Sequence, residues 1–188
     1  RCILNRWKIC RKSLIALLFL TMNKVVLITG GARGIGSAIA LELAKHGYDI
    51  VINYLTSKQP AKELKEKIES EYHVHCLTIC ADVSDVDQVN IMISEVEEKM
   101  GGVDILINNA AVDLSNLFHL KNAEEFKRTL DVNVVGAFNC SKRVYKHMLN
   151  QEYGRIINIS STNGINTYYP MCIDYDASKA ALISMTHN

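Results

Sequence analysis

The chain of 188 residues is long enough to bury one substantial hydrophobic core and too short for two ordinary domains. Its 21 basic and 20 acidic residues are mixed along the sequence and give a formal net charge of +1, which argues against nucleic acid or an anionic membrane as the partner. A single globular domain that acts on a small molecule remains as the expectation.

The six cysteines, at positions 2, 10, 76, 80, 140 and 172, form no CxxC pair and show no even spacing. This usage is typical of reduced thiols in a cytoplasm. The stretch "HVHCLTIC" resembles a metal-ligand cluster, but along a strand His73 and His75 would point to one side and Cys76 and Cys80 to the other. We therefore predict no metal site.

The first 21 residues combine basic residues with a short apolar run, 14–20, as in the first two regions of a signal peptide. No small-residue cleavage site follows, and the run is far shorter than the ~20 residues of a membrane span. Met22 then opens "MNKVVLITGG", which reads as the start of a domain. We expect residues 1–21 to be an upstream extension outside the fold, without stable membrane insertion, and residues 22–188 to form the domain. A short membrane-associating tail is the alternative.

From residue 24 onward, β-branched apolar runs alternate with segments of helical periodicity. The expected strands are 25–29, 49–54, 74–80, 103–109 and 155–160. The expected helices are 36–47, 60–72, 84–101, 122 to about 149, and one that opens near Tyr175. Ser84 is the expected N-cap of the third helix and Gly101 its end, and Asn122 with Glu125 form a capping pair for the fourth. Five strands joined by helical crossovers predict an α/β fold, a Rossmann-type doubly wound parallel sheet with helices on both faces.

The first strand runs into "TGGARGIG", which places Gly30, Gly34 and Gly36 at the start of a helix. Glycine permits a positive φ and lets the backbone approach a pyrophosphate, while the helix N-terminus supplies unpaired N–H groups and a favourable dipole. Between a buried strand and a helix, this loop indicates dinucleotide binding rather than a bare turn.

The GxxxGxG spacing resembles the short-chain dehydrogenase/reductase family, whose main branch uses TGxxxGxG. The resemblance runs from Lys24 to the last residue. It implies that Asp82 contacts the adenine amino group and Val83 flanks the ring, and that Asn109 of "NNAA" lies against the cofactor. The implied catalytic residues are Asn133, Ser161, Tyr175 and Lys179. The implied cofactor contacts are Thr29, Gly30, Arg33, Gly34, Ile35, Gly36, Asn53, Tyr54, Asp82, Val83, Asn109, Ala110, Tyr175 and Lys179. Ala111 departs from the family's usual glycine, and its methyl group would matter if the position needs positive φ.

The charge near the adenosine ribose favours NADP(H) over NAD(H). An NAD site places an acid at the end of the second strand, where it repels a 2′-phosphate. Here that strand ends "INYLTSK" without an acid, and Arg33 supplies a guanidinium that can hold a phosphate. The alternatives are that Arg33 is solvated and idle, or that Lys58 shares or replaces its role.

Tyr175 and Lys179 lie one helical turn apart on the same face, so the lysine can supply a positive charge beside the phenol. A phenol with a pKa near 10 needs a nearby positive charge to exchange protons at neutral pH. The resemblance implies that Tyr175 protonates the alkoxide formed by hydride transfer and that Ser161 donates a second hydrogen bond to it. It further implies that Lys179 also binds the nicotinamide ribose and that Asn133 holds a water linking Lys179 to solvent.

Within the family, "GRIINISS" and "YDASKAAL" look most like the 3-oxoacyl-[acyl-carrier-protein] reductases of fatty acid synthesis. The expected substrate is therefore a small-molecule or acyl-carrier-linked carbonyl compound. A reductase of another ketone, sugar or steroid and a non-catalytic dinucleotide-binding module are the alternatives. The resemblance implies a sheet that continues with two further strands, so we expect the chain to be a fragment, poorly soluble or inactive by itself, with Leu182, Ile183 and Met185 lacking partners. A homodimer or homotetramer is expected at full length.

Overall fold

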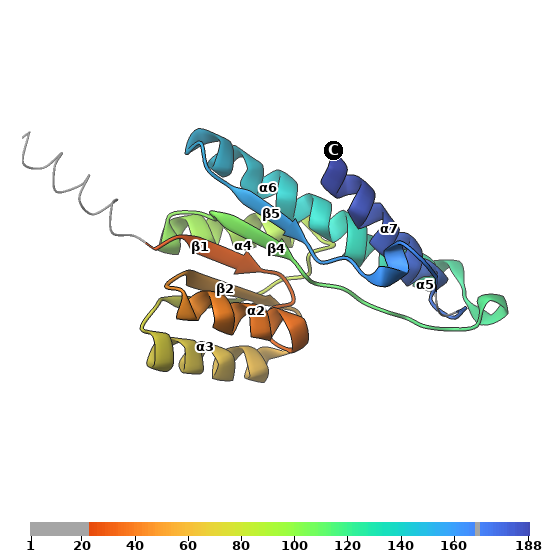
Figure 1. Ribbon diagram of the computed structural model, residues 1–188, viewed down its shortest axis with the longest axis horizontal. Coiled ribbons are helices and arrows are strands. Elements are labelled where there is room, and N and C mark those ends of the chain that lie inside the picture. The colour runs from red at the N-terminus through yellow and green to blue at the C-terminus, as the bar shows by residue number, and fades with distance from the viewer. Residues whose placement is uncertain (1–22, 168–169) are drawn as a thin grey trace, which may run out of the picture.

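The computed structural model describes residues 23–167 and 170–188, so the expected extension 1–21 lies outside the described residues. Five strands form the central sheet, with helices on either side (Figure 1). The strands are β1 (Val25–Ile28), β2 (Asp49–Tyr54), β3 (Cys76–Cys80), β4 (Ile105–Asn108) and β5 (Arg155–Asn158). The helices are α2 (Gly34–Lys45), α3 (Lys58–Tyr72), α4 (Val86–Met100), α5 (Ala123–Leu130), α6 (Gly136–Asn150) and α7 (Ile173–His187). Shorter helical turns are η1 (Phe118–Leu120), η2 (Asp131–Val135) and η3 (Thr162–Gly164).

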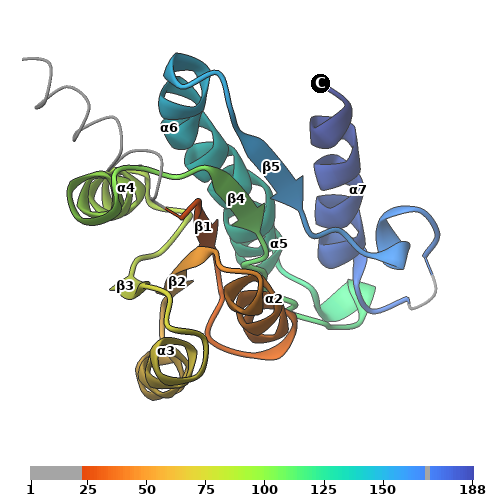
Figure 2. The same cartoon turned by 60° about the vertical axis from the view of Figure 1, so that its left-hand side comes forward.

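The sheet has the strand order β3-β2-β1-β4-β5, and every neighbouring pair is parallel. Leu27 in the central strand pairs with Val51 on one side and with Leu106 on the other. The chain therefore winds outward from β1 to β3, then returns to the far side of β1 for β4 and β5, as Figure 2 shows from a second direction. The predicted doubly wound parallel sheet is confirmed. Ligands of such sheets bind beyond the carboxyl ends of the strands, where the winding direction reverses.

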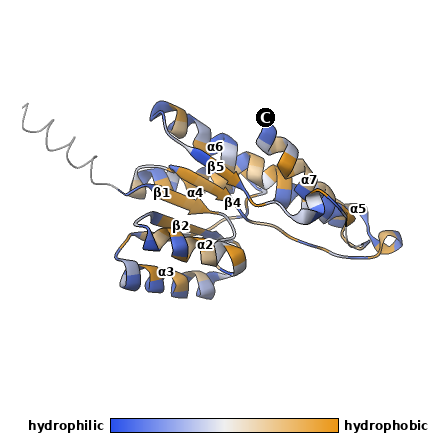
Figure 3. Ribbon diagram, in the orientation of Figure 1, coloured by the Kyte–Doolittle hydropathy of each residue, from blue (hydrophilic) through white to orange (hydrophobic). Residues whose placement is uncertain are grey.

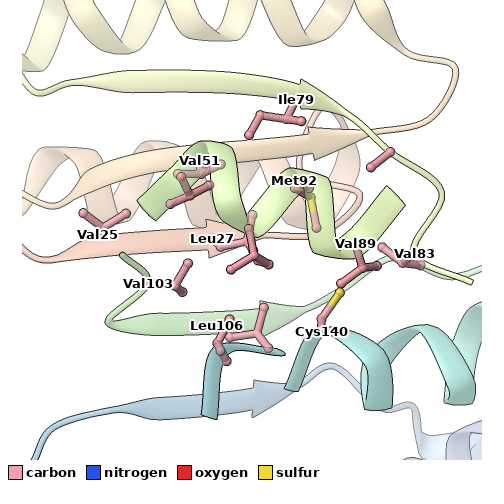
Figure 4. Packing of buried hydrophobic residues seen from close by; sticks show 14 of the residues in the cluster. Val25, Leu27, Val51, Ile79, Val83, Val89, Met92, Val103, Leu106 and Cys140 are labelled. Carbon is pink, nitrogen blue, oxygen red and sulfur yellow. The ribbon is translucent and has the colours of Figure 1, made fainter. Parts of the chain in front are cut away.

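Alternate residues of the strands enter two separate hydrophobic layers, as the strand period of two requires. Leu27, Val51 and Leu106 pack against α4 and α6, together with Met92 and Cys140 (Figure 4). The other strand face packs on α2 and α3, and its buried residues are Val26, Ile28, Ile50, Ile52, Ile105 and Ile107. β1, β2 and β4 are accordingly mostly hydrophobic, whereas the helices carry hydrophilic residues as well (Figure 3). Burial on both faces holds the carboxyl ends of these three strands in fixed positions, whereas β5, at the edge of the sheet, is largely exposed.

Several predicted boundaries are confirmed and one cap is wrong. β2 has its predicted bounds, Gly101 ends α4 with φ of 85°, and Asn122 and Glu125 form the predicted capping box of α5. Ser84 does not cap α4. Asp85 does so, because its carboxylate accepts hydrogen bonds from the amides of Asp87 and Gln88.

The predicted long helix from 122 to 149 is three consecutive helical segments, α5, η2 and α6. The expectation that Leu182 lacks partners is also wrong: Leu182 is 2% exposed. It is buried because α7 packs beside α5, η2 and β5. Within residues 23–167 and 170–188, each helix falls short of the length or the apolarity that crossing a membrane requires.

Candidate functional site

The glycine loop between β1 and α2 has the conformation that the spacing predicts. Gly30 and Gly34 have φ of +60° and +58°, which side chains rarely adopt. A Cβ atom on Gly36 would lie 2.8 Å from Asn109 Nδ2 and 2.8 Å from the Gly30 carbonyl oxygen, so only glycine lets α2 approach the sheet this closely. A Cβ atom on Gly34 would have no other atom within 4 Å, and Gly34 lines the cleft. The loop therefore fits a pyrophosphate held against bare backbone.

The loop forms one wall of a cleft of about 450 Å³ along the carboxyl ends of β1 to β4. Its lining includes many of the sequence-predicted residues: Gly30, Arg33, Gly34, Ile35, Asn53, Tyr54, Asp82, Val83, Asn109 and Ala110. Ala111, Val112, Arg128 and Val132 line the cleft as well. The structure thus gathers residues from four separate loops around one space of a size suited to a nucleotide.

Three of the predicted contact residues brace the glycine loop from behind. Asn53 is buried, and its side chain accepts a hydrogen bond from the Gly30 amide at 3.3 Å and donates one to the Ala81 carbonyl at 3.0 Å. The Thr29 hydroxyl accepts hydrogen bonds from the amides of Asn109 and Ala110, both at 3.0 Å. Asn109 Nδ2 donates to the carbonyl oxygen of Thr29 at 2.9 Å. These side-chain groups hold the loop in shape, and their direct contact with a cofactor stays a prediction.

The wall that follows β2 carries no carboxylate among its described residues, which are Asn53, Tyr54, Leu55, Thr56 and Ser57. Arg33, the N-cap residue of α2, also lines the cleft and is exposed. The described wall after β2 therefore carries no carboxylate to repel a phosphate, and Asp82, after the neighbouring β3, is paired with Arg128.

Asp82 is bound on both carboxylate oxygens. Its Oδ1 accepts from the Ser84 hydroxyl at 2.6 Å and from the Ser84 amide at 2.9 Å, and its Oδ2 accepts from Arg128 Nη2 at 2.9 Å. Arg128 Nη1 also donates to the Ser84 hydroxyl at 2.8 Å. Sequence reasoning missed Arg128, because 46 residues separate it from Asp82 and no motif includes it.

Ser161, Tyr175 and Lys179 come together at the end of β5 and the start of α7. Lys179 Nζ lies 5.5 Å from the centre of the Tyr175 ring and donates to the Ile159 carbonyl at 2.7 Å. Burial lowers the pKa of Lys179 to about 8. Burial also raises the pKa of Tyr175 above its ordinary value, and a hydrogen bond with Ser161 opposes that rise. The pKa of Tyr175 thus shifts upward, opposite to the lowering expected from a neighbouring ammonium group, and Lys179 is not among the groups that shift it.

Asn133 lies in η2, a π-helical turn of the kind that recurs at functional sites. Its side chain accepts from the Val112 amide at 2.8 Å and donates to the Val112 carbonyl at 2.9 Å. Nδ2 also donates to the Ser178 hydroxyl at 3.0 Å, and Ser178 donates to the Tyr175 carbonyl at 2.6 Å. Asn133 therefore links the loop after β4 to α7 by hydrogen bonds. Its predicted water-mediated link to Lys179 stays a prediction, and Ser178 is a member of the site that sequence reasoning missed.

Ala111 causes no backbone strain. Among the described residues, the positive-φ positions outside glycine are His73 and Glu152. The loop therefore accepts alanine in place of the family's usual glycine, because the position does not need positive φ.

Residues 24–188 match the family model described as short chain dehydrogenase. The chain belongs to the short-chain dehydrogenase family. It is 40% identical over 165 residues to the 3-oxoacyl-[acyl-carrier-protein] reductase FabG of Staphylococcus aureus (strain Mu50), covering 88% of this chain and 66% of that protein. It is 35% identical to the acetoacetyl-CoA reductase of Paracoccus denitrificans, covering 88% of this chain and 65% of that protein.

A solved structure of NAD⁺-bound xylitol dehydrogenase superposes with a TM-score of 0.82 at 32% identity, covering 88% of this chain and 64% of that one. The chain thus spans about two thirds of the length of the short-chain dehydrogenases that it matches. Within that part, the cleft lies along the carboxyl ends of β1 to β4, and the phenol, hydroxyl and buried ammonium group lie outside its lining, after the neighbouring strand β5 and on α7. This arrangement is able to hold a dinucleotide and to move a proton beside it.

Proposed function

We propose that the protein is an NADPH-dependent oxidoreductase that reduces the carbonyl group of a 3-oxoacyl thioester to a secondary alcohol. The observation that carries the proposal is the grouping of Tyr175, Ser161 and the buried Lys179 at the carboxyl end of β5, the strand next to β4, whose following loop lines the cleft. A non-catalytic dinucleotide-binding module has no need of a proton donor held beside a buried ammonium group. The grouping therefore favours an enzyme.

Each residue of the group has a proposed part in the reaction. When bound, NADPH supplies a hydride to the carbonyl carbon. Tyr175 gives its proton to the carbonyl oxygen, and Ser161 donates a hydrogen bond to the same oxygen as negative charge develops on it. The Lys179 ammonium group stabilises the tyrosinate that remains. Asn133 joins α7 to the loop after β4 and so helps to hold Tyr175 in place.

The substrate class is supported by the relatives. The Staphylococcus aureus protein is a reductase of 3-oxoacyl groups on acyl-carrier protein, and the Paracoccus denitrificans protein is a reductase of acetoacetyl-CoA. Both names describe 3-oxoacyl thioesters. Assembly into a homodimer or homotetramer and a cytoplasmic location stay predictions.

The decisive test follows the absorbance of NADPH at 340 nm while the intact protein is offered acetoacetyl-CoA, a 3-oxoacyl-acyl-carrier protein, a simple ketone, a keto-sugar and a ketosteroid. We expect turnover of the two thioesters at a kcat/KM at least about tenfold above that of the other carbonyl compounds. Turnover of the sugar or the steroid alone would replace the proposed substrate. Absence of turnover with every carbonyl compound, alongside tight NADPH binding, would favour the binding module.

An NAD-dependent polyol dehydrogenase is the second candidate, because the superposed xylitol dehydrogenase is NAD⁺-bound. The wall after β2, which carries no carboxylate among its described residues, and Arg33 in the cleft lining favour NADPH instead. We expect Arg33→Ala to weaken NADPH binding about tenfold or more and to change NADH binding less than about twofold, because only NADPH carries the 2′-phosphate. Isothermal titration of both cofactors checks this, with the exposed Arg155→Ala at the opposite end of the sheet as the control. Equal losses for both cofactors would contradict the role of Arg33.

A further inference from the structure

Asp82 is the one acidic side chain among the described residues that line the cleft. It follows β3, which is the last strand on its side of the sheet, whereas Ser161 and Tyr175 follow β5 on the other side. Four strand intervals, or ~19 Å, separate those two strands. With the glycine loop after β1 between them, Asp82 lies at the end of the cleft remote from the reacting groups. A dinucleotide that places its nicotinamide near Tyr175 places its other base near Asp82.

The carboxylate of Asp82 is held in one orientation by two residues. Ser84 donates twice to Oδ1, and Arg128 donates to Oδ2. Arg128 also binds the Ser84 hydroxyl, so the three side chains close a ring of hydrogen bonds. Arg128 reaches this ring from α5, an element that has no other part in the cleft. The position of the Arg128 guanidinium therefore sets the orientation of Asp82 Oδ2 relative to the cleft.

Counting acceptor sites shows what this carboxylate can still bind. A carboxylate offers about four acceptor positions, and three of them are filled by Ser84 and Arg128. Burial alone would raise the pKa of Asp82, but hydrogen bonds from Ser84 and Arg128 hold it below its ordinary value. The one acceptor position left free, on Oδ2, is therefore that of an ionised carboxylate. It fits a donor such as the exocyclic amino group of adenine and disfavours a carbonyl oxygen at the same place on the base.

We propose that Arg128 is a positioning residue that makes the cleft prefer an adenine base, acting through Asp82. The inference rests on the proposed binding of NADPH. Arg128 turns and fixes Oδ2 so that its free acceptor position faces the base. Without the guanidinium, Asp82 keeps its bonds to Ser84 alone, and Oδ2 is free to turn toward solvent. The expected consequence is loss of discrimination at the base, with the rest of the dinucleotide still bound.

The test compares three ligands by fluorescence titration of the intact protein: NADPH, its hypoxanthine analogue, and reduced nicotinamide mononucleotide, which has no second base. The hypoxanthine analogue carries a carbonyl oxygen where adenine has its amino group. We expect the protein to bind NADPH about tenfold or more tightly than the analogue, as a hydrogen bond to a charged acceptor implies. In Arg128→Met this preference falls below about threefold, and binding of the mononucleotide is unchanged.

The matched control is Arg143→Met. Arg143 forms an ion pair with Glu97 through two hydrogen bonds of 2.7 Å between α6 and α4, outside the residues that line the cleft. We expect this variant to keep the full preference for NADPH over the hypoxanthine analogue. Arg128→Lys, which keeps the charge with a different geometry, is expected to fall between the native protein and Arg128→Met.

Two results would overturn the inference separately from the proposed function. If the native protein binds NADPH tightly and Arg128→Met keeps the preference for adenine, Arg128 has no part in base selection. If Arg128→Met weakens the mononucleotide as much as it weakens NADPH, its role is structural. Failure of the native protein to bind any of the three ligands would instead remove the proposed function, and this inference with it.

Discussion

The ammonium group of Lys179 is buried, which is unfavourable for a charge. Its side chain is 2% exposed, and no carboxylate among the described residues lies within ion-pair distance of its Nζ. The backbone carbonyl of Ile159 is the acceptor that it contacts. Burial lowers its pKa from 10.5 to about 8, which means that the folded protein holds this proton less tightly than the unfolded chain does. Such a cost is common where chemistry requires a charge.

Replacing Lys179 by methionine should therefore stabilise the ligand-free protein. Below pH 8 the folded state bears the cost of the buried charge, and the cost fades as pH rises from about 8 to about 10.5. The shift corresponds to at most ~3 kcal/mol, and the lost bond to Ile159 offsets part of it. We expect Lys179→Met to raise the free energy of unfolding by about 1–2 kcal/mol at pH 7 and by less at pH 9.5.

Urea denaturation at the two pH values measures this change. The exposed Lys146→Met serves as the control and should stay within about 0.5 kcal/mol of the native protein at both. A Lys179→Met variant that is less stable at pH 7, or equally stabilised at pH 9.5, would show that the ammonium group is not the source of the cost.

The residue scale also shows where sequence reasoning ends. Tyr175 and Lys179 are predictable because both lie on one helix, where a spacing of four fixes their relation. Asp82 and Arg128 are joined by the docking of α5 beside the end of β3, and no local pattern encodes that contact. Asn53 illustrates the same limit: its position in the sequence suggests a cofactor contact, which stays a prediction, and does not reveal that its buried side chain also braces the glycine loop.

At the scale of elements, η2 joins three parts of the site. Asn133 within it binds both backbone groups of Val112 and the hydroxyl of Ser178 on α7. The sequence predicts a long helical region here, opened by the Asn122 and Glu125 cap, without a sign of the π-helical turn inside it. The π-helical turn depends on tertiary contacts that Asn133 makes with other elements, so local propensity does not reveal it.

We expect Asn133→Ala to lower the free energy of unfolding by about 2–3 kcal/mol, because it leaves the N–H and C=O groups of Val112 without their buried partner. Asn139→Ala is the matched control. Asn139 is partly buried and makes one bond, to the Val83 carbonyl at 3.2 Å, so its loss should cost about 1 kcal/mol or less. Chemical denaturation of both variants tests this. Similar decreases in the free energy of unfolding for the two would show that the hydrogen bonds of Asn133 add no particular stability.

One of the two predicted N-caps is confirmed and the other is wrong, because only the first depends on local hydrogen bonds alone. The Asn122 box is local, since both of its hydrogen bonds lie within four residues, and it is confirmed. Ser84 has the right residue type for a cap, but its hydroxyl is engaged by Asp82 and Arg128. Asp85, one residue later, caps α4 instead.

At the scale of the whole molecule, the reversal of winding between β1 and β4 creates the cleft. Strand and helix alternation in the sequence was enough to predict the parallel, doubly wound sheet, because such connections are right-handed and leave few topologies. The sheet then aligns the glycine loop, Asp82 and the Tyr175 group along one edge, although they are widely separated in sequence. Under the proposed function, the order along that edge, from the adenine end to the reacting end, follows from the strand order.

The central claim is that Tyr175 donates the proton that completes carbonyl reduction, and comparison of Tyr175→Phe with the native protein tests it most directly. The measurement is steady-state reduction of acetoacetyl-CoA by the intact protein, together with NADPH titration. We predict that Tyr175→Phe binds NADPH within about threefold of the native protein and that its kcat falls about 100-fold or more. A variant that binds NADPH normally and keeps kcat within about fivefold of the native protein would contradict the account.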